Sequence, residues 1–292
     1  MGNNTQIKKI SKWEQEVYDF VTSTGVSAEQ SNRDILEGKE IDIYIPDLKI
    51  GIECDGLRWH NETHKPKNYH LEKTKECAKR GVRLIHIFED EWISNKEIWK
   101  SMLVNILGLT SEKIYARNCT VRETTPKEKR KFLKHNHIQG NAQSSYNIGL
   151  YCNDELVSLM AFGVPRTSKE DKDTYELVRF CNKINTNVVG GASKLFNYFV
   201  SKHNPNKIVS YSDKRWSTGR LYEVLGFENT HDSRPGYSYV NDLVRENRYK
   251  YRKSQLIKEG YDKNKSEHEI MFERGIFRIY DCGSKVWVWR KG

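Results

Sequence analysis

Residues 40–60, EIDIYIPDLKIGIECDGLRWH, constrain the fold of this chain more than any other stretch of its sequence. Apolar residues alternate before a Pro-Asp turn, and a second apolar run follows the turn. This pattern predicts a β-hairpin. Because successive side chains point to opposite faces of a strand, Glu53 and Asp55 should share one face. The hairpin would bring together the ionisable side chains Asp42, Glu53, Asp55 and His60.

These side chains suit the binding of a divalent cation. Carboxylate oxygens are hard ligands, and a nearby imidazole orients or deprotonates water. Metal-assisted hydrolysis of a phosphodiester needs both kinds of group. A single Asp on a strand is more often a solvated surface residue, so it is the clustering that favours a site.

Composition indicates a polyanionic partner and a reducing compartment. The chain has 292 residues with 49 Lys and Arg against 39 Asp and Glu, a formal net charge of +10. Such an excess favours nucleic acid as the partner. The six cysteines contain no C-x-x-C pair, which argues against a zinc finger and for free thiols. Since no apolar run approaches the roughly 20 residues of a membrane span, we expect a cytoplasmic protein without membrane contact.

The order of apolar patterns predicts an α/β (α+β) protein in three consecutive parts. Residues 1–110 read as helix, two strands, helix, strand and helix. Residues 111–240 read as a second α/β domain, and 241–292 as a basic C-terminal extension. Expected helices are 11–23, 70–80, 127–136, 192–203 and 217–225; expected strands are 82–92, 175–182 and 207–212; hairpins are expected over 146–162 and 276–289.

The first part resembles a known nuclease family. From Asp42 through the segment DGLRWH, the spacing is similar to that of the very-short-patch mismatch-repair endonucleases, which have the restriction-endonuclease-like fold, and of related phage homing endonucleases. The resemblance covers roughly residues 10–95. Asp55 departs from the pattern, because it stands where related enzymes carry lysine or histidine.

The resemblance implies a role for each matching residue. Asp42 corresponds to the Mg²⁺-binding aspartate, and Cys54 stands where a backbone carbonyl completes the metal's coordination. His60 corresponds to the histidine that acts on water, and Glu14 to a helical glutamate for which Glu16 and Glu29 are competitors. The implied catalytic residues are Glu14, Asp42, Glu53, Asp55, His60 and His70, and the implied ligands of Mg²⁺, with Mn²⁺ as an alternative, are Asp42, Glu53 and Cys54.

The second part resembles the Gcn5-related acetyltransferase fold. NVVGGASKLF (187–196) opens a helix with two glycines, similar to the pyrophosphate loop of that fold. STGRLYEVLGF (217–227) is similar to its late helix, where a tyrosine serves as general acid. The resemblance implies acetyl-CoA binding by Gly190, Gly191 and Ala192, with Tyr222 as the acid. The alternative is that the glycines make only a tight turn and Tyr222 belongs to the core.

Basic and aromatic residues predict contacts with double-stranded DNA. Trp59 either packs in the core or wedges between bases. The basic tail, if helical, would align its arginines in one stripe, although a charge run is usually a solvated face. The predicted DNA contacts are Trp59, Arg245, Arg248, Arg252 and Lys253.

These observations predict a Mg²⁺-dependent DNA endonuclease. The resemblance implies a homing endonuclease encoded by a phage or mobile element, acting in the cytoplasm of a bacterial host as a monomer or homodimer. One alternative is an acetyl-CoA-dependent acetyltransferase that modifies nucleic acid or protein and uses the first part for binding. A second is a catalytically silent DNA-binding protein.

Overall fold

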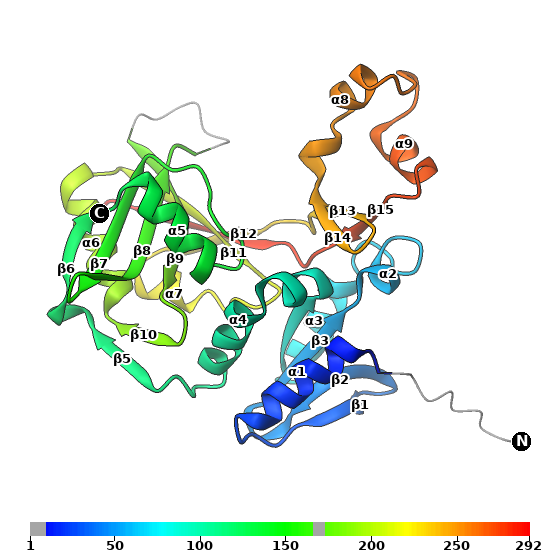
Figure 1. Ribbon diagram of the computed structural model, residues 1–292, viewed down its shortest axis with the longest axis horizontal. Helices are drawn as coiled ribbons and strands as arrows, with labels where there is room; N and C mark the ends of the chain where they lie inside the picture. The colour runs from blue at the N-terminus through cyan, green and yellow to red at the C-terminus, as the bar shows by residue number, and fades with distance from the viewer. Residues whose placement is uncertain (1–9, 166–172) are drawn as a thin grey trace, which may run out of the picture. The chain divides into compact units, whose positions relative to one another are not determined.

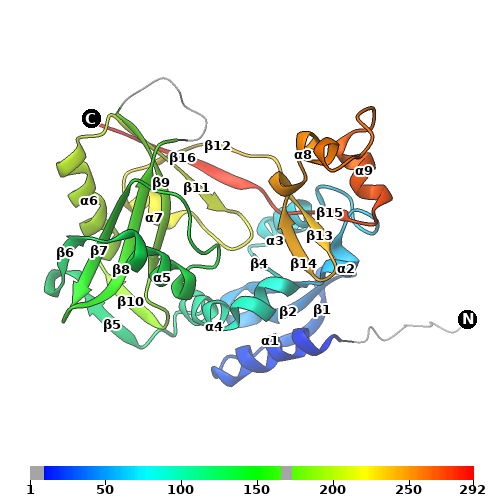
Figure 2. The same ribbon diagram turned by 45° about the horizontal axis from the view of Figure 1, so that its top comes forward.

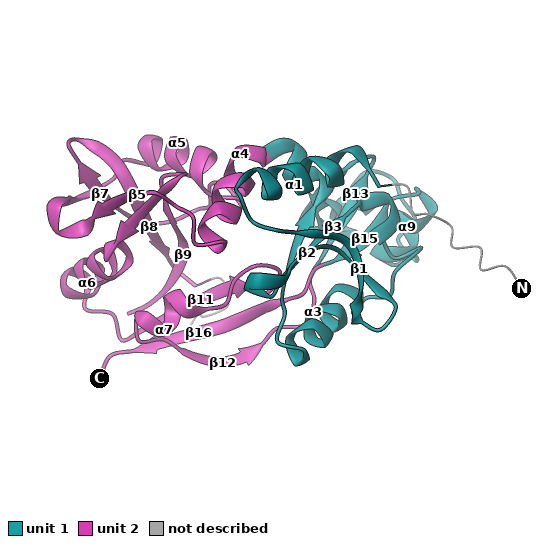
Figure 3. Cartoon of the chain, turned by 90° about the horizontal axis from the view of Figure 1, so that it is seen from below, with its two compact units in different colours: residues 1–94, 237–280 teal, residues 95–236, 281–292 magenta. Residues whose placement is uncertain are grey.

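The chain is a mixed α/β protein with several sheets, and it divides into two compact units (Figure 3). The computed structural model describes residues 10–165 and 173–292. Unit 1 comprises residues 1–94 and 237–280, and unit 2 comprises 95–236 and 281–292. This division differs from three consecutive parts, because the chain returns to unit 1 after residue 236 and then finishes in unit 2. No helix in the described part is long and apolar enough to cross a membrane.

The first segment of unit 1 is a four-stranded sheet of order β1-β2-β3-β4, in which only β3 and β4 are parallel. Helix α3 packs on it through Cys77, which joins Leu84 and Val82 in a buried cluster. Helix α1 begins after Ser11, whose hydroxyl accepts from the backbone of Glu14. The elements are α1 (Lys12–Ser23), β1 (Glu29–Leu36), β2 (Lys39–Ile45), η1 (Pro46–Leu48), β3 (Ile50–Asp55), α2 (Leu57–His60), α3 (Tyr69–Lys79) and β4 (Arg83–Phe88). Helix α4 (Glu89–Ile106) begins in unit 1, is kinked at Asn95 and continues in unit 2.

The second segment of unit 1 is a three-stranded sheet of order β14-β13-β15 with short helices attached. It packs on the first segment through a buried cluster of Leu57, Phe88, Val240 and Ile279. Charged groups reinforce the contact, since Arg245 forms ion pairs with Asp90 and Glu91. Its elements are β13 (Tyr237–Asn241), β14 (Val244–Asn247), η3 (Arg248–Tyr251), α8 (Lys253–Lys258), α9 (Glu267–Glu273) and β15 (Phe277–Tyr280).

Unit 2 is built on a seven-stranded sheet of order β12-β16-β11-β9-β8-β7-β6 (Figure 1). The only parallel neighbours in this sheet are β11 and β9. A separate parallel pair joins β10 to β5. The elements are β5 (Glu112–Tyr115), η2 (Ala116–Asn118), β6 (Thr120–Glu123), α5 (Pro126–Asn136), β7 (Tyr146–Cys152), β8 (Glu155–Gly163), β9 (Thr174–Asn182), β10 (Thr186–Val189), α6 (Gly191–His203), β11 (Lys207–Asp213), α7 (Arg220–Val224), β12 (Glu228–Asp232) and β16 (Ser284–Arg290).

Helices cover both faces of this sheet (Figure 2). Alternation along β8 sends Met160 and Phe162 into the main core, where Phe162 stacks on Phe199 of α6 with ring centroids 3.6 Å apart. The intervening Leu159 and Ala161 pack instead with Phe132 and Leu133 of α5. Because side chains alternate between the two faces of a strand, β8 contributes apolar residues to the hydrophobic layers on both sides of the sheet.

Two expectations about the C-terminal region are wrong. Residues 276–289 do not form a hairpin, because β15 pairs with β13 in unit 1 while β16 pairs with β11 and β12 in unit 2. Residues 245–260 do not form one helix, because β14, η3 and the short α8 divide them. The predicted arginine stripe therefore does not exist. The first error concerns pairing between segments distant in sequence, which local patterns do not report; the second concerns a local hairpin, because β14 pairs with the neighbouring β13.

Gly219 provides a test of packing beneath α7. Its φ is +89°, and a Cβ atom there would lie 2.2 Å from the ring of Trp287. Gly140 also has positive φ, at +59°, but no atom lies within 4 Å of the corresponding position. We expect Gly219→Ala to lower the free energy of unfolding by about 1–3 kcal/mol more than Gly140→Ala does. Urea denaturation of both variants measures the difference, and equal losses would contradict the observed packing.

Candidate functional sites

A cavity of about 1010 Å³ opens in unit 1, and it gathers most of the residues predicted from the hairpin. Acidic groups line it together with cationic and aromatic side chains. The site residues among its lining are Glu14, Asp42, Glu53, Cys54, Trp59 and His60, and the cationic ones include Arg33, Lys39, Arg58, Lys65 and Lys73.

Asp42 lies in an acidic group at this cavity. Carboxylate oxygens of Glu14, Glu40 and Asp42 lie within 4.8 Å of one another. Asp42 also accepts a hydrogen bond from the backbone of Cys54 at 2.7 Å, which ties β2 to β3. Of the glutamates considered for this position, Glu14 reaches the group, whereas Glu16 accepts a hydrogen bond from Trp92.

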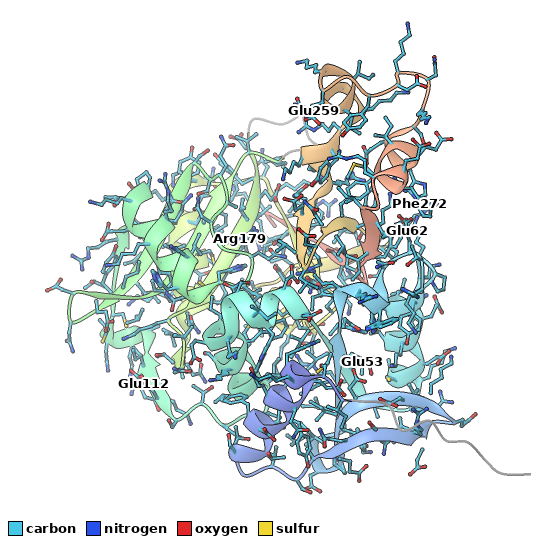
Figure 4. The ribbon with its side chains drawn as sticks, turned by 45° about the vertical axis from the view of Figure 1, so that its right-hand side comes forward. Glu53, Glu62, Glu112, Arg179, Glu259 and Phe272 are labelled. Atoms are coloured by element: carbon cyan, nitrogen blue, oxygen red, sulfur yellow. The ribbon has the colours of Figure 1, made fainter. Side chains whose placement is uncertain are left out.

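Glu53 on β3, which Figure 4 labels, is fully buried. It forms an ion pair with Lys73 of α3, with 2.5 Å between Oε2 and Nζ. Burial and the nearby charge of Asp42 raise the pKa of Glu53 well above its ordinary value, while Lys73 opposes that shift. Burial alone would lower the pKa of Lys73, but Glu53 raises it on balance. Glu53 is therefore a buried carboxylate whose charge is compensated by one partner, Lys73.

Asp55, the departure from the family pattern, lies at the centre of a histidine cluster. Its Oδ1 is 3.0 Å from His60 Nδ1 and 3.4 Å from His70 Nε2, and its Oδ2 is 2.9 Å from His86 Nδ1. Burial by itself would raise the pKa of Asp55, but the three imidazoles hold it well below its ordinary value. Asp55 is thus an anion without exposure to solvent.

The predicted DNA contacts have different surroundings. Trp59 is 60 % exposed, so it is not a core residue. Arg245 forms ion pairs with Asp90 and Glu91, and its guanidinium lies over the ring of Phe88. Arg248 and Arg252 both lie over the ring of Tyr249, and Lys253 is exposed at the start of α8.

In unit 2, the parallel strands β9 and β11 pair at only three positions, from Lys207↔Thr174 to Val209↔Glu176. At the next position the Ser210 hydroxyl donates to the carbonyl of Leu177 at 2.8 Å, in place of a ladder bond. Beyond this point β9 continues to Asn182, while β11 stays paired with β16 along its other edge, from Lys207 to Asp213. The two strands therefore diverge after Glu176.

Tyr222 lies at the divergence. Its hydroxyl oxygen is 3.2 Å from Ser210 Oγ and donates to the carbonyl of Tyr211 at 3.3 Å. The Tyr222 ring stacks on Trp287 with centroids 5.2 Å apart. Burial raises the pKa of Tyr222, so the hydroxyl keeps its proton at neutral pH.

The predicted glycines lie at the start of α6. Gly190 is the N-cap, with φ of +75° and no side-chain capping bond. A Cβ on Gly191 would lie 2.9 Å from Val188, so the helix approaches β10 closely. Ala192 follows in the first turn, and Lys194 Nζ donates to the carbonyls of Ala116 and Cys119.

Sequence reasoning did not include three residues that complete the unit 1 site: Glu40, Lys73 and His86. A signal for Lys73 exists, because it follows His70 by three residues and precedes Cys77 by four, which places all three on one face of a helix. His86 stands in a strand that is apolar at nearly every other position, which marks it as a buried polar group.

Comparisons with known proteins give no family assignment. No family model matches the chain, and no curated protein matches it. Among solved structures, the ribosomal-protein-S18-alanine N-acetyltransferase from Escherichia coli is 10 % identical, with 59 % of this chain and 93 % of that chain covered and a TM-score of 0.37. An acetyltransferase from Elizabethkingia anophelis with acetyl-CoA bound is 14 % identical, with coverage of 60 % and 99 % and a TM-score of 0.34.

A homing-endonuclease catalytic domain is also similar, at 20 % identity, with coverage of 35 % of this chain and 99 % of that chain and a TM-score of 0.29. With TM-scores below 0.5, none of these likenesses alone assigns a fold or an activity. The neighbours are mostly acetyltransferases, in keeping with the resemblance of the middle region. The very-short-patch likeness of the first part stays a prediction.

The expected enzyme class needs correction. The sequence predicts a Mg²⁺-dependent DNA endonuclease, but the solved structures that are similar to this chain are mostly acetyltransferases, which are acyltransferases and not hydrolases. The hairpin took precedence because it is the most informative local pattern, although NVVGGASKLF and STGRLYEVLGF already supported the acetyltransferase alternative.

The Glu53–Lys73 pair gives a prediction about stability. We expect Lys73→Met to lower the free energy of unfolding by about 3–5 kcal/mol at neutral pH, because it leaves Glu53 buried and uncompensated. A carboxyl whose pKa is higher in the folded state than in the unfolded state does not destabilise the protein at pH values below its unfolded-state pKa. It lowers the free energy of unfolding as the pH rises from that value toward its folded-state pKa. The loss should therefore shrink at acidic pH.

Urea denaturation at several pH values measures this effect, and Lys75→Met is the matched control. Lys75 lies on the same helix but pairs with Glu72 at the surface, so its loss should cost less than about 0.5 kcal/mol at any pH. A loss for Lys73→Met that is equal at all pH values would exclude Glu53 as its cause.

Proposed function

We propose that this chain is an acetyl-CoA-dependent acyltransferase whose site lies at the divergence of β9 and β11 in unit 2. The observation that carries the proposal is the three-position pairing of these parallel strands, with the Tyr222 hydroxyl at the point where they diverge. The sheet order β12-β16-β11-β9-β8-β7-β6 supports it. The pair β9 and β11 is the one parallel pair in an otherwise antiparallel sheet, so the proposed site lies where the sheet changes its pairing.

The divergence suits an extended ligand that carries amide groups. From Arg179 to Asn182, β9 pairs with β8 on one side and has no ladder to β11 on the other. An extended chain with amides can add to such an edge by hydrogen bonding to the backbone. The pantetheine arm of acetyl-CoA has this chemistry. The start of α6, capped only by Gly190, would hold its phosphates through backbone N–H groups.

Acetyl-CoA supplies an activated acyl group as a thioester. An acceptor amine forms the new C–N bond as the C–S bond breaks; the amine nitrogen loses one proton to water, and the departing sulfur gains one. Tyr222 can deliver it, because its raised pKa keeps the hydroxyl protonated and its position is fixed by Ser210 and Trp287. Ser210 is held in turn by the carbonyl of Leu177.

We also propose double-stranded DNA as the macromolecular partner, bound through unit 1. Exposed rings and cations lie next to one another there: Arg58 over Trp59 at 5.3 Å, and Arg252 over Tyr249 at 4.9 Å. Trp59 and Tyr249 are 60 % and 54 % exposed. Cations beside exposed rings can bind phosphates and bases together, and the net charge of +10 favours the same partner.

The cofactor proposal predicts that acetyl-CoA stabilises the full-length protein. At about 100 times its dissociation constant, a ligand of the folded state adds about 2.7 kcal/mol. We therefore expect acetyl-CoA to raise the thermal midpoint in a concentration-dependent manner. Differential scanning fluorimetry measures the midpoint, and no shift at millimolar acetyl-CoA would end the proposal.

Tyr222→Phe should separate binding from chemistry. The variant keeps the stacked ring and loses only the hydroxyl, so it should bind acetyl-CoA normally but release CoA thiol about 10²- to 10⁴-fold more slowly. Tyr211→Phe is the control, because Tyr211 contributes its backbone carbonyl to the site while its side chain is 43 % exposed. Calorimetry gives the affinity and a thiol reagent gives the rate. Equal rates in the two variants would remove Tyr222 from the mechanism.

The partner proposal predicts DNA binding that weakens steeply with salt. Arg252→Ala should weaken binding at all sequences and reduce the slope of log affinity against log salt by about 1. Arg130→Ala, a change on α5 of unit 2, is the control and should leave the slope unchanged. Fluorescence anisotropy with a labelled duplex measures both. A flat salt dependence for the wild-type protein would exclude this mode of binding.

A further inference from the structure

Three side chains from three elements of unit 1 bring potential metal ligands to one point. Asp55 ends β3, His60 ends α2 and His70 lies in the first turn of α3. His60 Nδ1 is 2.9 Å from His70 Nε2 and 3.0 Å from Asp55 Oδ1, and His70 Nε2 is 3.4 Å from the same oxygen. The three atoms therefore form a compact triangle.

The edges of this triangle match those of a metal's coordination shell. Zn²⁺ binds nitrogen and oxygen ligands at about 2.0–2.2 Å. Neighbouring ligands at that distance stand about 2.9 Å apart around an octahedral ion and about 3.4 Å apart around a tetrahedral one. We propose that Asp55, His60 and His70 bind a divalent transition-metal ion of the Zn²⁺ class.

Hydrogen bonding alone does not account for the close approach of these groups. His60 Nδ1 is paired with His70 Nε2. Asp55 Oδ1 is buried, and the ring nitrogens of His60 and His70 lie 3.0 Å and 3.4 Å from it. His60 Nδ1 carries at most one proton, yet it approaches both Asp55 Oδ1 and His70 Nε2, so one donor is shared between two buried acceptors. An incompletely satisfied buried carboxylate oxygen is costly. A cation among the three atoms would satisfy it.

Residues behind the triangle hold Asp55 in place. His86 Nδ1 lies 2.9 Å from the other oxygen of Asp55, and His86 Nε2 lies 2.9 Å from the Thr74 hydroxyl. Both Asp55 and His86 are fully buried. Such outer contacts fix the orientation of metal ligands in known sites, and here they leave Oδ1 directed at the two other histidines.

The donor set selects the class of metal. Two imidazoles and one carboxylate suit Zn²⁺ and its neighbours in the transition series, whereas Mg²⁺ prefers oxygen ligands alone. His60 lines the unit 1 cavity, so an ion has a route to the triangle and a coordination position can face the cavity. The inference goes beyond acyl transfer and does not depend on it, because all three ligands belong to unit 1.

Zinc binding to the full-length protein tests this proposal. After dialysis against a chelator, titration with ZnCl₂ in a calorimeter should show one site, and Co²⁺ should give visible absorption bands that Zn²⁺ abolishes. His60→Ala removes a ligand at the cavity wall and should weaken Zn²⁺ binding by about 100-fold. His70→Ala should do the same.

His64→Ala is the matched control, because His64 lines the same cavity and is not part of the triangle. It should bind Zn²⁺ as the wild type does, and circular dichroism checks that each variant folds. Stoichiometric binding lost in His60→Ala and kept in His64→Ala supports the site. No stoichiometric binding by the wild type, or equal binding by the His60 and His64 variants, overturns it.

Discussion

The architecture of unit 2 depends on one strand that arrives late in the sequence. Strand β16 lies between β11 and β12 and pairs with both. Its Trp287 is buried, donates to the Ser212 hydroxyl at 2.8 Å and supports the Tyr222 ring. Without β16, β11 would lose its neighbour and Tyr222 its support. The geometry proposed for acyl transfer therefore depends on the pairing of β11 with β16, two strands that the second segment of unit 1 separates in the sequence.

Unit 1 buries two carboxylates of a single strand, in addition to aromatic rings such as Trp92 and Tyr239. Asp55 and Glu53 lie two residues apart on β3, and each is compensated by different chemistry. Lys73 neutralises Glu53 directly, whereas three imidazoles surround Asp55. Buried charges are costly unless paired. Their presence beside an open cavity therefore indicates that unit 1 serves binding or chemistry as well as stability.

The sequence predicted local structure well and long-range structure poorly. The helices near 12–23 and 126–136 follow from capping residues and apolar spacing, and the 146–162 hairpin follows from its Asn-Asp turn. The grouping of Asp55 with His60 also follows from short spacing. Helical spacing places Lys73 on one face with His70, but its pairing with Glu53 and the separation of β15 from β16 do not follow from the sequence, because each depends on a partner that adjacent residues do not specify.

The interleaving of the two units has a consequence for synthesis. Leu57 and Phe88 are covered by Val240 and Ile279, which a ribosome translates between 152 residues (Phe88 to Val240) and 222 residues (Leu57 to Ile279) later. At about 5–20 residues per second, the nascent chain would leave this apolar surface open for on the order of ten seconds. Neither unit can complete its fold before its last segment has left the ribosome. Production of this protein should therefore be sensitive to chaperone supply and temperature, even if the finished fold is stable.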